Sequence, residues 1–271
     1  MRQKIDGHYY TYHWTTPYQK DRPTLLCLHG FTGTGQTFSC LKDVDAYNIL
    51  ILDLIGHGSS AAPQLGKYYQ FDYVLSIIDN FLNSLSLTKV DVLGYSMGAR
   101  TALGFTLDYP EKVNQLIMES GTPGIECPKE RQKRQKQDHQ LAEEIEHQGI
   151  EAFVDSWERL PLFATQNDLP ALRRIAIRNE RLAQKKVGLA NSLRFMGTGV
   201  MPNYWPRLKE LLHKRVVLIV GTKDEKFSQI AMNMKIFQPT IQVVTVKHAG
   251  HCIHLEQPDK FISIINQMAG E

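Results

Sequence analysis

One serine between two glycines is the residue of this chain best suited to do chemistry. Ser96 lies in Gly94-Tyr95-Ser96-Met97-Gly98, which follows an apolar run at 90–93 and leads into a helical pattern. The small neighbours allow a strained turn from strand to helix, and this turn puts the hydroxyl at the helix N-terminus, where the dipole favours negative charge. The spacing therefore predicts a nucleophile elbow with Ser96 at its tip.

A base and an acid for this serine follow later in the chain. His251 comes after the apolar run 243–246, and Asp224 comes after the apolar run 216–220. Such positions place both side chains on loops at the carboxyl edge of a parallel sheet. Glu225 is a neighbouring rival for the acid, and we assign the role to Asp224. The order serine, aspartate, histidine is that of the α/β-hydrolase triad.

The segment His29-Gly30-Phe31-Thr32 follows a strand-like run at 24–28 and is the candidate oxyanion loop. The backbone N–H of Phe31, together with that of Met97, is expected to form an oxyanion hole beside the serine. We expect His29 to orient this loop rather than to act as a second base, and we include it among the residues around the substrate.

Arg100 indicates what kind of substrate the serine meets. It lies four residues after Ser96, one turn along the same helix, so its guanidinium can lie beside the pocket. A surface arginine in a salt bridge is the alternative interpretation. A neutral ester or lipid would gain nothing from a buried cation, whereas a carboxylate would receive a bidentate partner. The position favours an anionic substrate.

Composition limits the class of protein. The chain has 271 residues, 42% of them hydrophobic, which suits one α/β domain with an insertion. Its 31 basic and 28 acidic residues do not give the excess of positive charge that is typical of a nucleic-acid binder, and the basic run 129–136 is interpreted as a solvated helix face.

No segment could cross a bilayer or serve as a signal peptide, so we expect a cytoplasmic protein without membrane insertion. Four cysteines without a C-x-x-C pair are expected to be reduced thiols: Cys27, Cys40, Cys127 and Cys252.

Two patterns could suggest a cofactor or a metal, and we interpret both as coincidental. The segment 56–61 matches a dinucleotide-binding motif, but the acidic residue that should follow has no strand to sit on, because 67–83 has the pattern of a loop and a helix. Three histidines are spaced three residues apart, at His248, His251 and His254. They lack an H-E-x-x-H motif, and Gly250 argues against a shared helix face. We expect no cofactor and no metal.

Short β-rich runs alternate with helical patterns, which predicts a largely parallel sheet with helices on both faces. The predicted strands are 9–14, 24–28, 49–52, 89–93, 115–118, 215–220 and 241–246. A last helix is expected after Gln257-Pro258. Between 125 and 205 the pattern changes to charged helical segments, at 129–147 and 170–186. We therefore divide the chain into a core at 1–124, an inserted helical cap at 125–205 and the rest of the core at 206–271.

With these motifs in hand, the chain resembles the 2-succinyl-6-hydroxy-2,4-cyclohexadiene-1-carboxylate synthase family, the menaquinone-pathway branch of the α/β-hydrolase superfamily. The likeness covers nearly the whole chain, and the cap motifs are its more specific part. The matching segments are 28–33, 53–58, 94–100, 119–124, 130–134, 153–157, 160–163, 177–179, 188–190, 197–199, 224–227 and 249–256.

In that family the substrate carries several carboxylates. The resemblance implies that arginines at three matching positions bind them: Arg100, Arg134 and Arg178. It also implies that Tyr95 and Trp157 line the pocket, and Lys226 is included among the substrate-binding residues. The sequence departs from the family pattern at Ala99, where a second glycine is frequent. It departs again at Glu158, which leaves any contact from that position open.

The implied reaction is an elimination and not a hydrolysis. The family removes a ring proton, expels the enolpyruvyl group as pyruvate and leaves a conjugated diene, with the triad making Ser96 a base. A carboxylesterase or thioesterase for a small anionic acyl substrate is the alternative enzyme, and a non-catalytic binding protein is the alternative outside enzymes. The expected partner is a small molecule with several carboxylates, and no nucleic acid. The sequence leaves the oligomeric state open, a monomer included.

Overall fold

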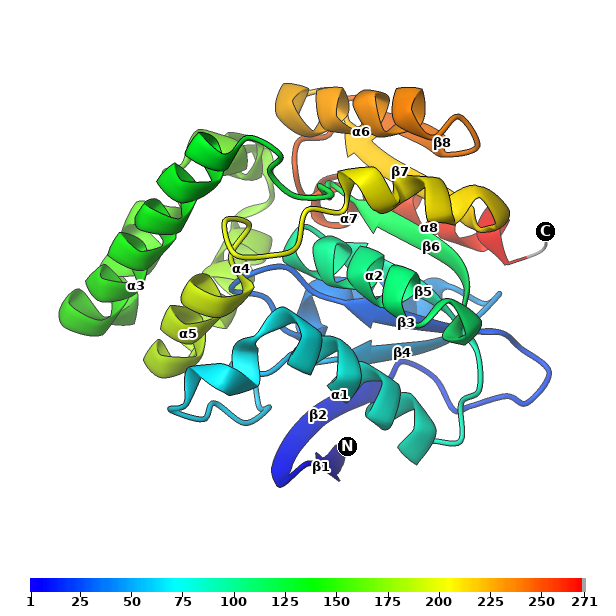
Figure 1. Cartoon of the computed structure of the whole chain (residues 1–271), viewed down its shortest axis with the longest axis horizontal. Coiled ribbons are helices and arrows are strands. Elements are labelled where there is room, and N and C mark those ends of the chain that lie inside the picture. Colours follow the sequence, from blue (N-terminus) through cyan, green and yellow to red (C-terminus); the bar gives the residue numbers. More distant parts are fainter. Residues whose placement is uncertain (270–271) are drawn as a thin grey trace.

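Continuous apolar runs form the middle of one eight-stranded sheet in the computed structural model, which describes residues 1–269 (Figure 1). The strands are β1 (Arg2–Ile5), β2 (His8–Trp14), β3 (Thr24–Leu28), β4 (Asn48–Leu52), β5 (Val90–Tyr95), β6 (Val113–Glu119), β7 (Arg215–Gly221) and β8 (Gln242–Val246). Their order is β1-β2-β4-β3-β5-β6-β7-β8. All neighbours from β4 to β8 pair in parallel, whereas β1 and β2 pair antiparallel. The predicted α/β class is confirmed.

The inner strands β3, β4 and β5 are buried along their whole length, as expected for parallel strands covered on both faces. All seven predicted strands are present, with bounds that differ by at most two residues. The sequence analysis missed β1, whose residues Arg-Gln-Lys-Ile lack an apolar alternation. A short charged strand is typical of a sheet edge, because charges there discourage pairing with another chain.

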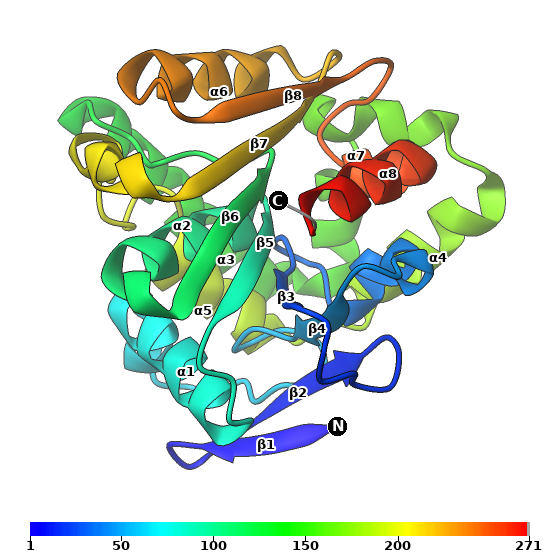
Figure 2. The same ribbon diagram turned by 90° about the vertical axis from the view of Figure 1, so that its right-hand side faces the viewer.

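Helices cover both faces of the sheet (Figure 2). One face packs against α1 (Phe71–Ser84), α2 (Met97–Asp108) and α6 (Glu225–Phe237), and the other packs against α8 (Pro258–Met268) and the 3-10 helix η1 (Gly35–Asp43). Shorter elements complete the core: η2 (Gly66–Tyr69), η3 (Pro110–Lys112), η5 (Trp205–His213) and α7 (Ile253–Glu256). The final helix begins at Pro258, as the sequence predicts.

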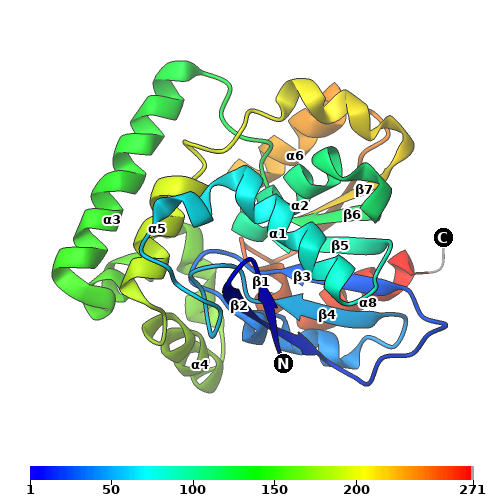
Figure 3. The same ribbon diagram turned by 60° about the horizontal axis from the view of Figure 1, so that its bottom comes forward.

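Four of the helices between β6 and β7 gather to one side of the sheet (Figures 1 and 3). They are α3 (Pro128–Trp157), η4 (Pro161–Asp168), α4 (Ala171–Leu182) and α5 (Lys186–Met196). The longest, α3, continues across Gly149, where a positive φ of 88° bends it. A small apolar cluster, which includes Ile145, Val154 and Leu189, joins α3 to α5. The cap bounds of 125 and 205 stay a prediction.

Strand order brings the candidate chemistry together. Because β3 lies beside β5, the loop that starts at His29 lies next to Ser96. Because β6, β7 and β8 follow in parallel, the loops that carry Asp224 and His251 emerge from the same carboxyl edge. The four segments are far apart in the chain, and the sheet places them at one edge.

Candidate active site

The serine sits in the strained turn that its glycines predict. Ser96 joins β5 to α2 with φ 51° and ψ −103°, a conformation that a residue with a Cβ rarely adopts. Two backbone hydrogen bonds hold it there. Ser96 N–H donates to the Glu119 carbonyl at 2.9 Å, and the Ser96 carbonyl accepts from Arg100 N–H at 3.2 Å.

The two flanking glycines are required by close approach. A Cβ on Gly94 would lie 2.3 Å from the Gly98 carbonyl oxygen, and a Cβ on Gly98 would lie 1.9 Å from the Leu28 carbonyl oxygen. Real Cβ atoms do not come that near to backbone. The absence of both side chains lets the first turn of α2 touch the end of β3, so the serine and the candidate oxyanion loop can share one site.

We expect Gly98→Ala to lower the free energy of unfolding by about 2–4 kcal/mol, because backbone rather than a movable side chain opposes the new methyl group. The sign of this change in unfolding free energy is informative, since replacing a helical glycine by alanine ordinarily stabilises a protein by about 1 kcal/mol. Urea unfolding measures it. Gly104→Ala in the same helix is the control, because its Cβ meets only side-chain atoms of Tyr204, Phe71 and Leu75. Equal losses in the two variants would contradict the explanation.

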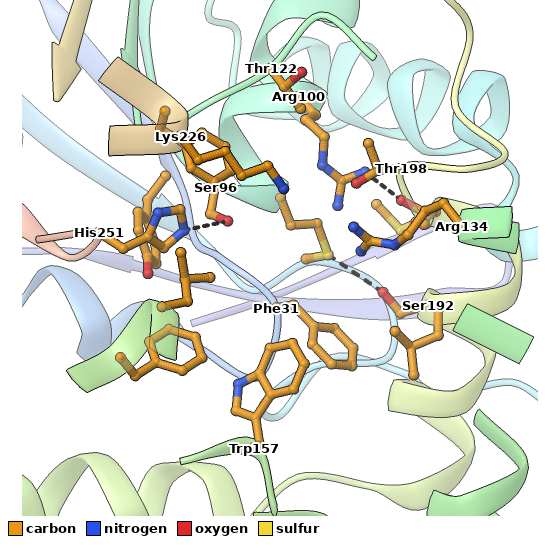
Figure 4. A pocket seen from close by; sticks show the side chains of 18 residues that line it. Phe31, Ser96, Arg100, Thr122, Arg134, Trp157, Ser192, Thr198, Lys226 and His251 are labelled. Atoms are coloured by element: carbon orange, nitrogen blue, oxygen red, sulfur yellow. Dashed lines mark hydrogen bonds between the residues drawn. The ribbon is translucent and has the colours of Figure 1, made fainter. Parts of the chain in front are cut away.

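Ser96, His251 and Asp224 form one hydrogen-bonded row, of which Figure 4 shows the contact between Ser96 and His251. His251 Nδ1 lies 2.7 Å from Asp224 Oδ2, and Nε2 lies 3.1 Å from Ser96 Oγ. A carboxylate can only accept here, so Nδ1 carries the proton and Nε2 is free to accept from the serine. His251 and Asp224 are both buried. Glu225, the rival acid, is exposed at the start of α6.

Neighbouring groups fix the histidine and the aspartate. Ser120 Oγ donates to the His251 carbonyl at 2.9 Å, and Asp224 Oδ1 accepts from Phe227 N–H at 3.3 Å as the N-cap of α6. The aspartate therefore caps α6 with Oδ1 and binds the His251 ring with Oδ2. This arrangement leaves His251 Nε2 aimed at the serine.

His29 orients the candidate oxyanion loop from behind the pocket. Leu54 N–H donates to Nε2 at 3.0 Å, which leaves the ring proton on Nδ1, and Nδ1 then donates to the Gly30 carbonyl at 2.8 Å. Burial lowers the pKa of His29 and keeps the ring neutral. The peptide between Gly30 and Phe31 is planar and trans, so a carbonyl held toward His29 points the Phe31 N–H the other way. His29 is fully buried and acts on the loop rather than on the cavity.

One cavity beside Ser96 and His251 is lined by most of the predicted site residues (Figure 4). They are Phe31, Tyr95, Ser96, Met97, Arg100, Arg134, Trp157, Lys226 and His251. The sequence analysis did not single out further lining residues, among them Thr122, Phe163, Ser192, Thr198 and Phe227. Four of these residues lie in segments that carry the family resemblance, which is the available signal: Thr122, Phe163, Thr198 and Phe227. Ser192 carries none.

Three cations line this cavity, and they are Arg100, Arg134 and Lys226. Arg100 is 8% exposed and donates only to uncharged groups, the Met196 carbonyl at 2.7 Å and the Met201 sulfur at 3.8 Å. Burial, and then nearby Arg134, lower the pKa of Arg100 and also that of Lys226. Arg134 pairs with Asp138 at 2.8 Å. In the chain from 1 to 269, no carboxylate lies within ion-pair distance of Arg100, so the cavity suits an anion.

Aromatic side chains form the opposite wall. Trp157 lies edge-on to Phe31, with ring centroids 5.4 Å apart, and both line the cavity. The indole Nε1 of Trp157 is buried and finds no acceptor in residues 1–269. Tyr95 contributes its ring and not its hydroxyl, because the hydroxyl lies 2.5 Å from Cys252 Sγ, away from the serine. Burial, with help from Cys252, raises the pKa of Tyr95 and keeps it protonated.

The structure does not bring Arg178 into this cavity. Arg178 lies on α4 and binds Asp155 at 2.6 Å and Glu158 at 2.8 Å, two carboxylates near the end of α3. It lines a separate recess on the outer side of Phe163, together with Arg181. The open question about Glu158 is answered by the same contacts, since its carboxylate binds both arginines. The expected substrate contact of Arg178 stays a prediction.

The patterns that could suggest a metal are explained by other contacts. His254 is fully buried and its Nδ1 binds Glu119 at 2.7 Å, whereas His251 belongs to the row with Ser96. Over residues 1–269 no three side chains of His, Cys, Asp or Glu are grouped so that they could hold a metal ion. In the same range no helix has the length and apolarity needed to cross a membrane. The four cysteines are unpaired thiols.

Comparison with known proteins shows the family. Residues 23–258 match the model of the α/β hydrolase fold. A Bacillus subtilis (strain 168) protein, provisionally named a 2-succinyl-6-hydroxy-2,4-cyclohexadiene-1-carboxylate synthase, is 42% identical over 244 residues, which are 90% of this chain and 89% of that protein. A Klebsiella pneumoniae protein named as the same synthase is 28% identical over 92% of this chain and 95% of its own.

Solved structures agree with this assignment. The structure of MenH from S. aureus superimposes with a TM-score of 0.87 at 34% identity, and the match covers 94% of this chain and 96% of that one. A thermophilic esterase from Thermogutta terrifontis, at 21% identity and a TM-score of 0.83, shares the fold. The chain therefore belongs to the α/β-hydrolase fold family and, within it, to the 2-succinyl-6-hydroxy-2,4-cyclohexadiene-1-carboxylate synthase family.

Proposed function

We propose that this protein is a lyase of menaquinone biosynthesis, which eliminates pyruvate from 2-succinyl-5-enolpyruvyl-6-hydroxy-3-cyclohexene-1-carboxylate and releases 2-succinyl-6-hydroxy-2,4-cyclohexadiene-1-carboxylate. One observation carries the proposal beyond family membership. The buried Arg100 guanidinium lies in the cavity of Ser96 without a carboxylate partner in residues 1–269. A cation buried this way is unfavourable until an anion binds it, and the substrate supplies several carboxylates.

The triad supplies the base. His251 Nε2 accepts the proton of Ser96 Oγ, and the serine oxygen then removes the proton from ring carbon C2, which bears the succinyl carbonyl group. The electron pair of that C–H bond forms the C2=C3 double bond, the existing C3=C4 double bond moves to C4=C5, and the bond between C5 and the enolpyruvyl oxygen breaks. The departing enolate takes the proton held by His251 and becomes pyruvate. Asp224 keeps the Nδ1 proton in place and stabilises the imidazolium while it exists.

Two further groups act on charge that develops in the ring system. Proton removal spreads negative charge onto the conjugated carbonyl oxygen, and the N–H groups of Phe31 and Met97 are assigned to stabilise it. The support for Met97 is its place at the first turn of α2, where the amides have no partner inside the helix. The elimination involves no net oxidation or reduction, so the reaction needs no electron donor or acceptor.

The cap and the cations hold the substrate. Arg100, Arg134 and Lys226 are assigned to its carboxylates, and Trp157 Nε1 to an oxygen acceptor. We assign residues 125–205 to a cap that covers the ring and excludes water, which would otherwise favour hydrolytic side reactions. We also propose that the reaction takes place in the cytoplasm and involves no nucleic acid. The unpaired cysteines support the first proposal, and the near balance of 31 basic and 28 acidic residues supports the second.

Product analysis tests the function. The purified protein is mixed with the enolpyruvyl substrate, and pyruvate is followed with lactate dehydrogenase while the conjugated diene is followed by its ultraviolet absorbance. Equimolar appearance of the two products is the expected result. A parallel assay uses p-nitrophenyl acetate, a small neutral ester. Efficient turnover of the ester without pyruvate release from the substrate would overturn the proposal in favour of an esterase.

Arg100→Met is expected to cost about 2–5 kcal/mol of transition-state binding, because an anion in a desolvated site loses its charge-assisted partner. That corresponds to a fall in kcat/KM of roughly 30-fold to several thousand-fold. Arg100→Lys should recover only part of it, since lysine keeps the charge and loses the planar fork. Steady-state kinetics of pyruvate release measures both variants.

Arg194→Met is the matched control, because Arg194 on α5 is ion-paired with Glu146 and does not line the cavity. An exposed pair of this kind contributes about 0–1 kcal/mol, so its loss should be small. Hydrolysis of p-nitrophenyl acetate should respond weakly to both changes. If Arg100→Met impaired both reactions equally, the arginine would serve the fold and not the anion.

A further inference from the structure

The oxyanion loop contains a strained residue that nothing in its own segment explains. Thr32, directly after Phe31, has a φ of 68°, and the Gly30 carbonyl accepts from Gly33 N–H at 3.1 Å across a tight turn. Thr32 is the third residue of this turn, where a positive φ is normally provided by glycine or asparagine. A β-branched threonine resists that conformation, so another part of the protein must hold it.

The side chain that contacts this turn comes from the cap. Gln184, just after the end of α4, is buried, and its Nε2 donates to the Thr32 carbonyl at 3.1 Å and also lies 3.5 Å from the Gly33 carbonyl. Its Oε1 accepts from Gly58 N–H at 3.1 Å. Because Nε2 faces carbonyl oxygens and Oε1 faces an N–H group, the orientation of the Gln184 amide is defined. One side chain thus connects the cap, the oxyanion loop and the loop after β4.

Glu180, which lies in α4 four residues before Gln184, holds the next residues of the loop. Its Oε1 accepts from Thr34 N–H at 2.7 Å, from Thr34 Oγ1 at 2.6 Å and from Thr37 Oγ1 at 3.3 Å. The end of α4 therefore binds the loop at two successive points. These contacts hold the backbone that follows Phe31 in a single conformation.

We propose that Gln184 is a positioning residue for the oxyanion hole, acting through Thr32 on the N–H of Phe31. His29 fixes the carbonyl side of the Gly30–Phe31 peptide, and Gln184 fixes the backbone just beyond it. Without Gln184, Thr32 relaxes to negative φ, the Phe31–Thr32 peptide rotates, and the Phe31 N–H loses its fixed direction. The cap then does more than cover the substrate, because the oxyanion hole is complete only while α4 is docked.

This inference rests on the oxyanion role assigned to Phe31 in the proposed function, so its test uses a reaction that needs no pathway substrate. A fluorophosphonate phosphonylates Ser96, with loss of fluoride, and its rate depends on stabilising charge on the phosphoryl oxygen in the same hole. Gln184→Met keeps the size of the side chain and removes its hydrogen bonds. We expect labelling to slow by about 10- to 100-fold, and kcat for pyruvate release to fall by a similar factor with KM within about twofold.

Two further variants separate positioning from cap docking. Asn191→Leu removes a comparable buried amide, whose Nδ2 donates from the cap to the Pro63 and Gln64 carbonyls, far from the oxyanion loop in the chain. It should leave the labelling rate within about twofold of the parent. Thr32→Gly adopts positive φ freely, so in that background Gln184→Met should slow labelling by less than about threefold.

The outcomes decide the proposal. Rescue by Thr32→Gly, with little effect of Asn191→Leu, supports it. Equal losses in Gln184→Met and Asn191→Leu, or a Gln184→Met loss that Thr32→Gly leaves unchanged, would assign Gln184 to cap docking alone. An unlabelled parent protein would also overturn it, whereas absent pyruvate release with normal labelling would overturn only the proposed lyase activity. If Gln184→Met does not fold, Gln184→Glu loses the same donors, keeps the acceptor for Gly58 and should slow labelling equally.

Discussion

Replacing Ser96 with alanine is expected to lower kcat for pyruvate release by about three to six orders of magnitude, the range seen when one member of a triad is removed. Ser96 Oγ is the atom that His251 Nε2 faces at 3.1 Å, and alanine leaves that nitrogen without a hydroxyl to activate. Stopped assays with a large amount of enzyme measure the residual rate.

Ser192→Ala is the control for this change. Ser192 lines the same cavity, but its hydroxyl contacts the sulfur of Met97 at 3.4 Å and forms no hydrogen bond with a histidine in residues 1–269. We expect a change in kcat of less than about tenfold, as for a residue that positions rather than reacts. Thermal unfolding of both variants should match that of the parent. Pyruvate release by Ser96→Ala near the parent rate would rule out Ser96 as the base.

The elements and residues that could be predicted from the sequence are those with a local signal. Buried parallel strands such as β3 and β5 are continuous apolar runs, and the edge strand β1 was missed because its four residues are mostly polar. The row of Ser96, His251 and Asp224 could be predicted because each residue directly follows a strand. Parallel pairing then brings the three strand ends to one edge.

Features set by contacts across the chain could not be predicted. Arg178 is expected at the substrate, but the packing of α4 against the end of α3 brings it to Asp155 and Glu158. The sequence of α4 alone does not predict how this helix is oriented against α3. Tyr95 was expected in the pocket and lies there, yet its hydroxyl is bound by a cysteine 157 residues away. Gln184 had no signal at all, because its importance depends on the backbone conformation of a distant threonine.

Asp224→Asn is expected to lower kcat by about four orders of magnitude while the protein remains folded, by the tautomer effect known for serine proteases. Asparagine can still cap α6, where Asp224 Oδ1 now accepts from Phe227 N–H, so the helix should keep its stability. Its NH₂ group can donate to His251 Nδ1, which moves the ring proton to Nε2. That nitrogen then cannot accept the proton of Ser96.

Glu225→Gln is the control for the acid, because Glu225 is adjacent in sequence, carries the same charge and is exposed at the start of α6. It should leave kcat within about twofold of the parent, as a surface substitution away from the site does. Nuclear magnetic resonance of the His251 ring shows which ring nitrogen carries the proton, and a change in stability alone would not alter this. The parent should show the proton on Nδ1 and Asp224→Asn should show it on Nε2. A damaging Glu225→Gln beside an active Asp224→Asn would transfer the role of the acid to Glu225, and the 2.7 Å contact of Asp224 with His251 would then be structural.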